Sequence, residues 1–218
     1  MNIVIIGTGY VGLVTGVGLA YLGNEINFFD LDKNKIKNLS SKRITFFEPG
    51  LEDYFNDDET FKRMSFTSNY ASIEWEKIDI VFVCVQTPNN IETNSVDTKF
   101  LESAIKEINN LNNNDIVITV KSTIPPYEIE KVCEKVGMDS NKLIFNPEFL
   151  REGTAVEDFF KPDRIILGGT DEEKLNKLKE LYSEFDCEII ITDSVSSQLI
   201  KYLANTYLPL RLSFVNEA

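Results

Sequence analysis

Three glycines near the amino terminus and an aspartate eighteen residues beyond the last of them have the spacing of a dinucleotide site. Gly7, Gly9 and Gly12 follow directly on the apolar run 2–6 and open a helical pattern. Glycines at these places let the chain turn tightly, approach a pyrophosphate and pack the helix close to the strand. Asp30 ends the second apolar run, where it can accept hydrogen bonds from an adenosine ribose. The loop and the acid together predict a dinucleotide-binding site.

The same aspartate bears on which dinucleotide binds. A 2′-phosphate about 4 Å from the Asp30 carboxylate would be repelled by roughly 4 kcal/mol per negative charge at an effective dielectric near 20. Lys33 or Lys35 could offset this repulsion, although both also fit solvated positions at the start of a helix. The helix after the glycine loop adds unpaired N–H groups and a partial positive charge for the phosphates. We therefore expect NAD rather than NADP.

Further motifs with polar residues occur at the ends of expected strands. They are Glu48–Glu52, Thr87-Pro88, Lys121–Pro125, Asn146–Gly153 and Pro162–Ile165. Ligands bind at this edge of an open parallel sheet. Taken singly, the motifs leave other interpretations open. Thr123 fits an ordinary helix cap, and Arg151 with Glu152 fits a surface ion pair in a turn.

Composition excludes several classes of function. The 218 residues contain no histidine, so we predict no metal site and expect any catalysis to use Lys, Glu, Asp, Thr or Cys. A net charge of −13 without a basic cluster argues against nucleic acid as a partner. The apolar runs are too short for a membrane span. Three widely spaced cysteines, Cys84, Cys133 and Cys187, favour a reducing, cytoplasmic location.

The elements that must position these groups alternate along residues 1–192. Short β-branched and aromatic runs predict strands, and the longer stretches between them predict helices. Strands are expected at 2–6, 26–29, 64–67, 79–84, 115–120, 142–146, 164–167 and 188–192, and helices at 10–22, 33–40, 98–110, 125–136 and 172–184. The Asn-rich stretch 109–114 is expected to be a capped turn. This alternation predicts a doubly wound α/β domain of the Rossmann type, with a parallel sheet covered on both faces.

Residues 193–218 have a different pattern, that of one long helix with no residue to stop it. We interpret it as the start of a helix that continues into a further region. Lys201 and Asn205 lie one turn apart on its apolar stripe, so they are expected to face inward and to need partners. A structural pair between Lys201 and Glu148 is the alternative. Pro209 is expected to kink the helix at Asn205.

In this order, the glycine loop, Asp30 and the strand-end motifs resemble the UDP-glucose and GDP-mannose dehydrogenase family over essentially the whole chain. The resemblance implies an enzyme that oxidises the C6 alcohol of a nucleotide sugar through an aldehyde to a carboxylate and reduces two NAD⁺. By this resemblance the cofactor site comprises Gly7, Gly9, Tyr10, Val11, Gly12, Asp30, Lys35, Thr87, Thr123 and Glu152. The nucleotide sugar would contact Glu148, Phe149, Leu150, Arg151, Glu152, Lys201 and Asn205.

The resemblance also implies roles for four residues. Thr123 would lie near the nicotinamide and a catalytic water. Glu148 would act as general acid or base, particularly in thioester hydrolysis. Lys201 and Asn205 would hold developing negative charge and orient the substrate. The family often has Glu where Gln198 stands in this chain.

One group that this chemistry needs is not found. Oxidation to the acid requires a thiolate that captures the aldehyde, because hydride can leave from the resulting adduct. In the family that cysteine lies in a Gly-Gly-x-Cys-type loop well beyond the first domain. Cys84, Cys133 and Cys187 instead fit core or partly buried positions. We therefore expect this chain alone to bind NAD without completing the reaction.

The motifs also favour one substrate. The sequence of Asn146–Gly153 resembles that of enzymes for UDP-glucose or GDP-mannose. The sequence of Pro162–Ile165 favours UDP-glucose, with GDP-mannose as the alternative. A non-catalytic NAD-binding module is a rival function, against which Glu148 and Lys201 argue. A dehydrogenase of the β-hydroxyacid type is another, and it gives no reason for the Asn-Pro-Glu segment. The resemblance further implies that the long helix serves a homodimer of the full-length protein.

Overall fold

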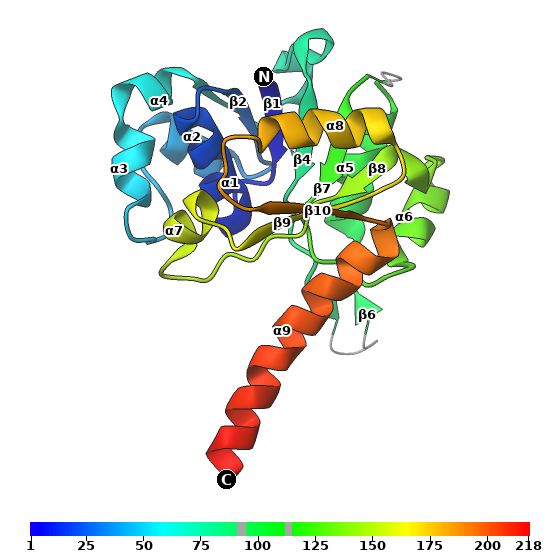
Figure 1. Ribbon diagram of the computed structural model, residues 1–218. Helices are drawn as coiled ribbons and strands as arrows, with labels where there is room; N and C mark the ends of the chain where they lie inside the picture. Colours follow the sequence, from blue (N-terminus) through cyan, green and yellow to red (C-terminus); the bar gives the residue numbers. More distant parts are fainter. Residues whose placement is uncertain (91–94, 112–114) are drawn as a thin grey trace.

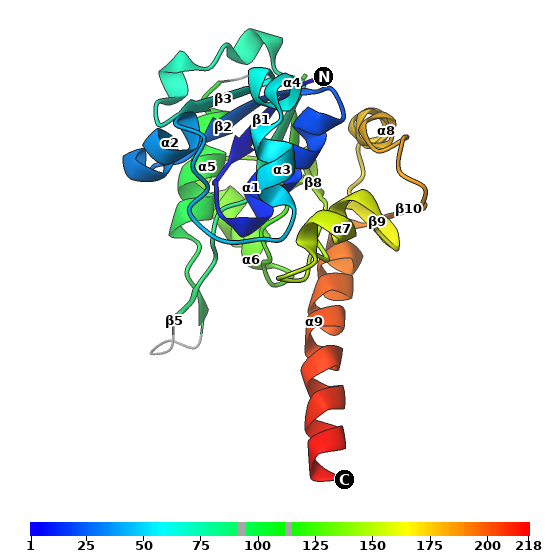
Figure 2. The same ribbon diagram turned by 90° about the vertical axis from the view of Figure 1, so that its left-hand side faces the viewer.

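A strand that is apolar at every position needs cover on both faces of its sheet. The computed structural model describes residues 1–90, 95–111 and 115–218. In it β1 (Asn2–Ile6) lies between β2 (Glu25–Phe29) and β4 (Ile80–Val83), and its last four residues are buried. Helices cover the sheet on both sides (Figures 1 and 2).

The sheet has eight strands in the order β10-β9-β8-β7-β4-β1-β2-β3. Its other strands are β3 (Met64–Thr67), β7 (Val117–Val120), β8 (Leu143–Phe145), β9 (Arg164–Gly168) and β10 (Glu188–Thr192). Neighbouring strands are parallel except β8 and β9, which meet antiparallel at Phe145 and Gly168. The predicted doubly wound α/β fold is confirmed, and the expectation of a wholly parallel sheet is wrong at this one junction.

The expected helices lie close to their predicted limits. They are α1 (Tyr10–Tyr21), α2 (Lys33–Ser40), α5 (Lys99–Asn109), α6 (Glu128–Val136) and α8 (Glu172–Leu181). The sequence does not indicate several short elements. Three are helices, α3 (Leu51–Asn56), α4 (Asp58–Lys62) and α7 (Ala155–Phe160). The others are the 3₁₀ turns Tyr70–Ser72, Trp75–Lys77 and Ser140–Lys142, and the hairpin of β5 (Asn89–Asn90) and β6 (Ser95–Val96). One or two turns are too short to display a helical period. Residues 112–114 of the expected Asn-rich turn lie outside the described residues.

Two hydrophobic clusters fill the space between the sheet and its helices. Ile3 and Ile5 belong to the cluster shared with α1, α3, α7 and α8. Val4 and Ile6 belong to the other cluster, which is shared with α5 and α6. Successive side chains of a strand point to opposite faces, so one five-residue strand contributes to both cores.

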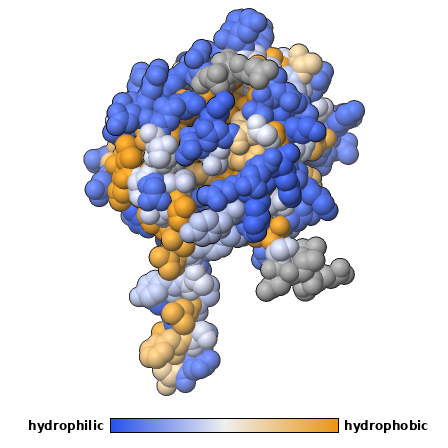
Figure 3. Space-filling model, turned by 90° about the vertical axis from the view of Figure 1, so that its right-hand side faces the viewer, coloured by the Kyte–Doolittle hydropathy of each residue, from blue (hydrophilic) through white to orange (hydrophobic). Residues whose placement is uncertain are grey.

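The last helix, α9 (Ser194–Glu217), extends away from the sheet. Asp193 caps its start, because its side chain accepts a hydrogen bond from the Ser196 amide at 2.8 Å. The first turns pack on β8 and β9, and the remainder projects outward (Figures 1 and 2). Apolar side chains are exposed along this projecting part (Figure 3), among them Leu203, Tyr207, Leu208, Leu210, Leu212, Phe214 and Val215. Within the described ranges, no helix is both long and apolar enough to cross a membrane.

Pro209 lies within α9, and the helix passes through it as one continuous element. Figure 2 shows no sharp bend at this place, so the predicted kink at Asn205 is wrong. Proline removes only one amide donor, and Asn205 is exposed, so water can pair with the carbonyl that loses its partner.

Asn146 joins three parts of the fold at the end of β8. It is 2% exposed, and its amide nitrogen Nδ2 donates to the Ile166 carbonyl at 2.9 Å. Its Oδ1 accepts a hydrogen bond from the Tyr182 hydroxyl at 2.7 Å, just beyond the end of α8. The start of the Asn146–Gly153 segment is thereby fixed against β9 and α8.

Replacing Tyr182 with Phe should destabilise the fold. The change removes the hydroxyl and leaves the Asn146 oxygen buried without a donor, which costs about 1 to 3 kcal/mol. Urea unfolding should report this loss in the free energy of unfolding. The matched control is Tyr21→Phe, since Tyr21 is 51% exposed. Equal stabilities of the two variants would contradict a stabilising role for the Tyr182 hydroxyl.

Glu48 holds the other end of the same segment. The residue is 4% exposed, and its carboxylate accepts hydrogen bonds from the Tyr10 hydroxyl at 2.6 Å, the Gly153 amide at 2.8 Å and the Ala155 amide at 2.7 Å. Burial alone would raise the pKa of Glu48, but these hydrogen bonds outweigh burial and the pKa lies below its ordinary value. The ionised carboxylate therefore connects α1 to the start of α7.

Glu48→Gln should lower the free energy of unfolding by roughly 2 kcal/mol at neutral pH, because hydrogen bonds to a charged acceptor are lost. The folded pKa is depressed, so the contribution of the carboxylate is fully present above its unfolded pKa and is lost as pH falls through the folded value. The stability gap between wild type and variant should therefore shrink between pH 7 and pH 3.5 in urea unfolding. Glu59→Gln, at a largely exposed position, serves as the control. A gap that did not depend on pH would contradict this account.

Candidate active site

The glycine loop has the geometry that its spacing predicts. Gly7 adopts a φ of +97°, and a Cβ on it would lie 2.6 Å from the Cys84 carbonyl oxygen. A Cβ on Gly12 would lie 1.9 Å from the Gly7 carbonyl oxygen, so helix and loop can approach only without a side chain there. A Cβ on Gly9, by contrast, would meet no atom within 4 Å. Space is therefore open at the start of α1, where helix amides bind phosphate.

Asp30 is held in place at the end of β2. Its Oδ2 accepts hydrogen bonds from both the amide and the hydroxyl of Thr8 at 2.8 Å, and its Oδ1 accepts one from the Asp32 amide at 2.9 Å. The Lys35 ammonium lies 3.9 Å from Oδ2. Of the two lysines named for their possible effect on cofactor choice, Lys35 lines the adjacent cavity and Lys33 does not.

A cavity of about 400 Å³ extends from the glycine loop along the carboxyl ends of β1, β4 and β7. Among the residues expected to bind the cofactor, those that line this cavity are Gly7, Gly9, Tyr10, Val11, Asp30, Lys35, Thr87 and Thr123. Gly12 lies behind the loop and acts through packing. Glu152 is exposed and lines neither this cavity nor the next one, so its contact with a cofactor or substrate stays a prediction.

Thr123 is not a helix cap. The helix that follows it, α6, begins only at Glu128, and Tyr127 occupies the capping position. The Thr123 carbonyl instead accepts a hydrogen bond from the Thr87 hydroxyl at 2.7 Å. This bond joins the segments that follow β4 and β7, and both residues face the first cavity.

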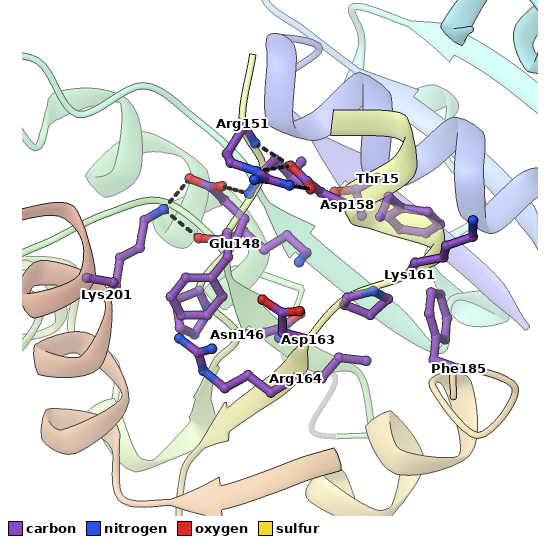
Figure 4. A pocket seen from close by; sticks show the side chains of 18 of the residues that line it. Thr15, Asn146, Glu148, Arg151, Asp158, Lys161, Asp163, Arg164, Phe185 and Lys201 are labelled. Atoms are coloured by element: carbon purple, nitrogen blue, oxygen red, sulfur yellow. Dashed lines mark hydrogen bonds and ion pairs between the residues drawn. The ribbon is translucent and has the colours of Figure 1, made fainter. Parts of the chain in front are cut away.

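A second cavity, of about 680 Å³, lies between the Asn146–Gly153 segment, the start of β9 and α9 (Figure 4). Of the residues expected to contact a substrate, those that line it are Glu148, Phe149, Leu150, Arg151, Lys201 and Asn205. The sequence did not single out Thr15, Tyr182 or Phe185, which also line it. None of the three belongs to a strand-end motif, so no local pattern in the sequence indicates them.

Lys201 and Glu148 form the ion pair that connects α9 to the sheet edge (Figure 4). The Lys201 Nζ lies 2.8 Å from Glu148 Oε1 and 2.5 Å from the Glu148 carbonyl oxygen. It also lies 5.4 Å from the centre of the Phe149 ring. The other carboxylate oxygen, Oε2, accepts the Leu150 amide at 2.8 Å. The inward orientation expected of Lys201 is confirmed, and its partner is the one that the structural alternative named. The same expectation for Asn205 is wrong, because Asn205 is exposed where α9 leaves the sheet, although it lines the second cavity.

Arg151 forms a surface ion pair, although with a different acid from the one the sequence suggests. Its guanidinium makes two hydrogen bonds to Asp158, with Nη2 at 2.6 Å and Nε at 3.1 Å, and its backbone amide adds a third at 2.8 Å. Burial would raise the pKa of Asp158, but the bonds from Arg151 outweigh it and the pKa is lowered. The interpretation of Arg151 and Glu152 as a surface ion pair is therefore wrong.

The two cavities meet at two side chains. Glu148 and Lys121 line both of them. Lys121 follows β7 directly and is 8% exposed. The sequence analysis includes Lys121 in a strand-end motif but assigns it no role. The sequence feature that could have indicated a role is the position of this lysine directly after a buried strand.

The thiols are unsuited to nucleophilic chemistry in this chain. Burial raises the pKa of Cys84 to about 12 and that of Cys133 to about 11, and the pKa of Cys187 is also raised by burial. Cys84 lines the first cavity, whereas Cys133 and Cys187 line neither. A thiol with a raised pKa is protonated near neutral pH and is a weak nucleophile.

Comparison with known proteins identifies the family of this chain. Residues 1–186 match the model of the NAD binding domain of the UDP-glucose/GDP-mannose dehydrogenase family. The UDP-glucose 6-dehydrogenase of Rickettsia typhi is 37% identical over 222 residues, which are all of this chain and 51% of that protein. A UDP-glucose 6-dehydrogenase of Bacillus subtilis is 37% identical over all of this chain and 50% of its own length.

Solved structures agree with this assignment. A UDP-glucose dehydrogenase from the archaeon Pyrobaculum islandicum superimposes with a TM-score of 0.88 at 34% identity, over 99% of this chain and 51% of that one. A GDP-mannose dehydrogenase from Pseudomonas aeruginosa gives a TM-score of 0.88 at 28% identity, over 100% of this chain and 52% of that one. The chain thus spans about half the length of these relatives. It belongs to the UDP-glucose/GDP-mannose dehydrogenase family and carries that family's NAD-binding domain.

Proposed function

We propose that this chain supplies the NAD site and part of the sugar site of a UDP-glucose 6-dehydrogenase. The reaction would oxidise the C6 alcohol of UDP-glucose to a carboxylate and reduce two NAD⁺. The observation that carries this proposal is the junction of the two cavities at Glu148 and Lys121. A cofactor in the first cavity and a sugar in the second would approach each other there, which hydride transfer requires.

The residues divide the work between the two ligands. The open face of Gly9 and the first turn of α1 fit the cofactor's pyrophosphate, and Asp30 fits its adenosine ribose. NAD⁺ supplies the hydride acceptor when it is bound. Thr123 would border the nicotinamide end, because it lines the first cavity far along the sheet edge from Asp30.

Glu148, Lys201 and Asn205 would act on the sugar. All three line the second cavity, and the contact between Lys201 and Glu148 fixes the two charged groups relative to each other. Lys201 would stabilise negative charge on substrate oxygen, and Asn205 would orient the substrate from the next turn of α9. Glu148 would exchange protons, particularly in hydrolysis of the thioester.

The thiol for the second oxidation would come from outside these residues. Cys84, Cys133 and Cys187 all have raised pKa values, and none lines the second cavity. We therefore propose that the 218-residue chain alone binds NAD⁺ without forming the carboxylate. Residues 1–192 would form the cofactor domain, and 193–218 would begin a central region in which the exposed apolar side chains of α9 pack in a homodimer.

UDP-glucose is preferred to GDP-mannose as substrate for a specific reason. Relatives named UDP-glucose dehydrogenase are 34 to 38% identical to this chain, and the GDP-mannose dehydrogenase is 28% identical at the same TM-score as the UDP-glucose dehydrogenase from Pyrobaculum islandicum. A non-catalytic NAD-binding module would have no use for Lys201 and Glu148 beside a second cavity.

Cofactor binding can be tested on the 218-residue chain by calorimetry. NAD⁺ should bind saturably, and Asp30→Ala should weaken it by about tenfold or more, since hydrogen bonds to a charged group contribute roughly 1.5 to 3 kcal/mol. NADP⁺ should bind more weakly than NAD⁺ to the wild type because of the Asp30 charge. Asp53→Asn, on the surface of α3, is the control. Equal affinity for the two dinucleotides would mean that Lys35 offsets the aspartate.

Turnover can be tested on the protein at its natural length. With UDP-glucose it should form two NADH for each sugar carboxylate, and with GDP-mannose it should react more slowly. The 218-residue chain alone should form no carboxylate, and circular dichroism with NAD⁺ binding would establish that it is folded. Absorbance at the NADH band and mass analysis of the sugar report both results. Sugar acid formed by the short chain would place the thiol among Cys84, Cys133 and Cys187 and overturn that part of the proposal.

A further inference from the structure

Lys121 is a buried amine at the boundary of the two cavities. It follows β7 directly, and its backbone amide donates to the Val83 carbonyl at 2.9 Å, which continues the sheet by one residue. The residue is 8% exposed, and its Nζ lies 5.5 Å from the centre of the Phe82 ring. Its side chain and that of Glu148 line both cavities.

The amine has no hydrogen-bond acceptor and no ion-pair partner within residues 1–90, 95–111 and 115–218. The carboxylate that acts on its charge, Glu148, already has both oxygens occupied, by Lys201 at 2.8 Å and by the Leu150 amide at 2.8 Å. Lysine side chains are seldom this deeply buried unless they are paired. An unpaired ammonium in such a place is costly, and the amine avoids that cost when it is neutral.

The groups that face Lys121 come from three other elements. Cys84 lies at the end of β4, Glu148 follows β8, and Lys201 comes from α9. Burial lowers the pKa of Lys121 most strongly, Cys84 and Glu148 act in the opposite direction, and Lys201 lowers it further. The balance lowers the pKa, which favours a neutral amine with a free lone pair.

We propose that Lys121 is a general base for the first oxidation, in which its amine accepts the proton of the sugar hydroxyl. This inference rests on the proposed function. The O–H bond breaks and its proton passes to the Lys121 Nζ. The C–H bond of the same carbon breaks and its electron pair leaves as hydride to NAD⁺, which is reduced to NADH. The carbon becomes an aldehyde, and Lys121 becomes an ammonium that donates to the new carbonyl oxygen.

The position of Lys121 suits this task better than that of Lys201. A base must reach the hydroxyl on the carbon that faces the cofactor, and Lys121 lines both cavities, whereas Lys201 lines only the second. Lys201 is also held by the carbonyl and carboxylate oxygens of Glu148. Those contacts already engage the Lys201 Nζ with Glu148, whereas the Lys121 Nζ has no such contact among the described residues.

The test compares variants of the protein at its natural length, with UDP-glucose and NAD⁺ between pH 6 and pH 9. Lys121→Met removes the base but keeps the length of the side chain. Lys121→Arg keeps a positive charge but stays protonated. Lys106→Met, at an exposed position of α5, is the control for loss of a lysine. The melting temperature and the affinity for NAD⁺ are measured for every variant. If Lys121→Met does not fold, Lys121→Gln takes its place.

Lys121→Met should lower kcat at neutral pH by about 100-fold or more, as loss of a general base does. The acidic limb of the wild-type rate profile, set by protonation of Lys121, should disappear from the residual activity. NAD⁺ affinity should change by less than about threefold, and Lys121→Arg should not restore the rate.

Two results would overturn the inference alone. One is a kcat of Lys121→Met equal to that of the wild type, with the acidic limb of the pH–rate profile retained. The other is rescue by Lys121→Arg, which would mean that only a positive charge is needed. If the wild-type protein binds NAD⁺ but forms no NADH from UDP-glucose, the proposed function fails and this inference fails with it.

Discussion

The contact between Lys201 and Glu148 is the interaction on which the site depends. It connects the helix α9 to the sheet edge, and it forms a boundary of the second cavity (Figure 4). Breaking a buried pair leaves one charge without compensation, which is far more destabilising than never having had the pair. The ion pair thus adds to the packing of α9 on β8 and β9 and helps to fix the position of Asn205. The Glu148 carbonyl strengthens the contact, because it accepts from the same ammonium.

The segment that carries Glu148 is itself held at both ends. Asn146 fixes its start through Ile166 and Tyr182, and Glu48 fixes its end through the amides of Gly153 and Ala155. Such a loop is ordered by buried hydrogen bonds rather than by regular secondary structure. A carboxylate in the middle of a fixed loop can face two ligands with little conformational cost, which is the preorganisation that catalysis needs.

Much of the fold could be predicted because its signals are local. Runs such as Ile3–Ile6 and the spacing of Gly7, Gly9 and Gly12 indicate strand, turn and helix without long-range information. The short helices α3, α4 and α7 could not be predicted, since they are stabilised by packing against α1 and against each other. The roles of Glu48 and Lys121 depend on contacts with distant parts of the chain. Glu48, for example, bonds to an amide 105 residues away, and no local pattern indicates that.

Occupied hydrogen bonds also constrain how Glu148 can act. Both carboxylate oxygens already accept donors, one from an ammonium and one from an amide. Neither oxygen is therefore open to a substrate or a water in this arrangement without the loss of one of these contacts. For Glu148 to take a proton from water or an adduct, the contact with Lys201 must lengthen or the ammonium must turn to the substrate. Negative charge on a substrate oxygen would draw Lys201 away from Glu148 and so free the carboxylate. On the proposed function, proton transfer by Glu148 would thus be coupled to the charge that develops beside Lys201.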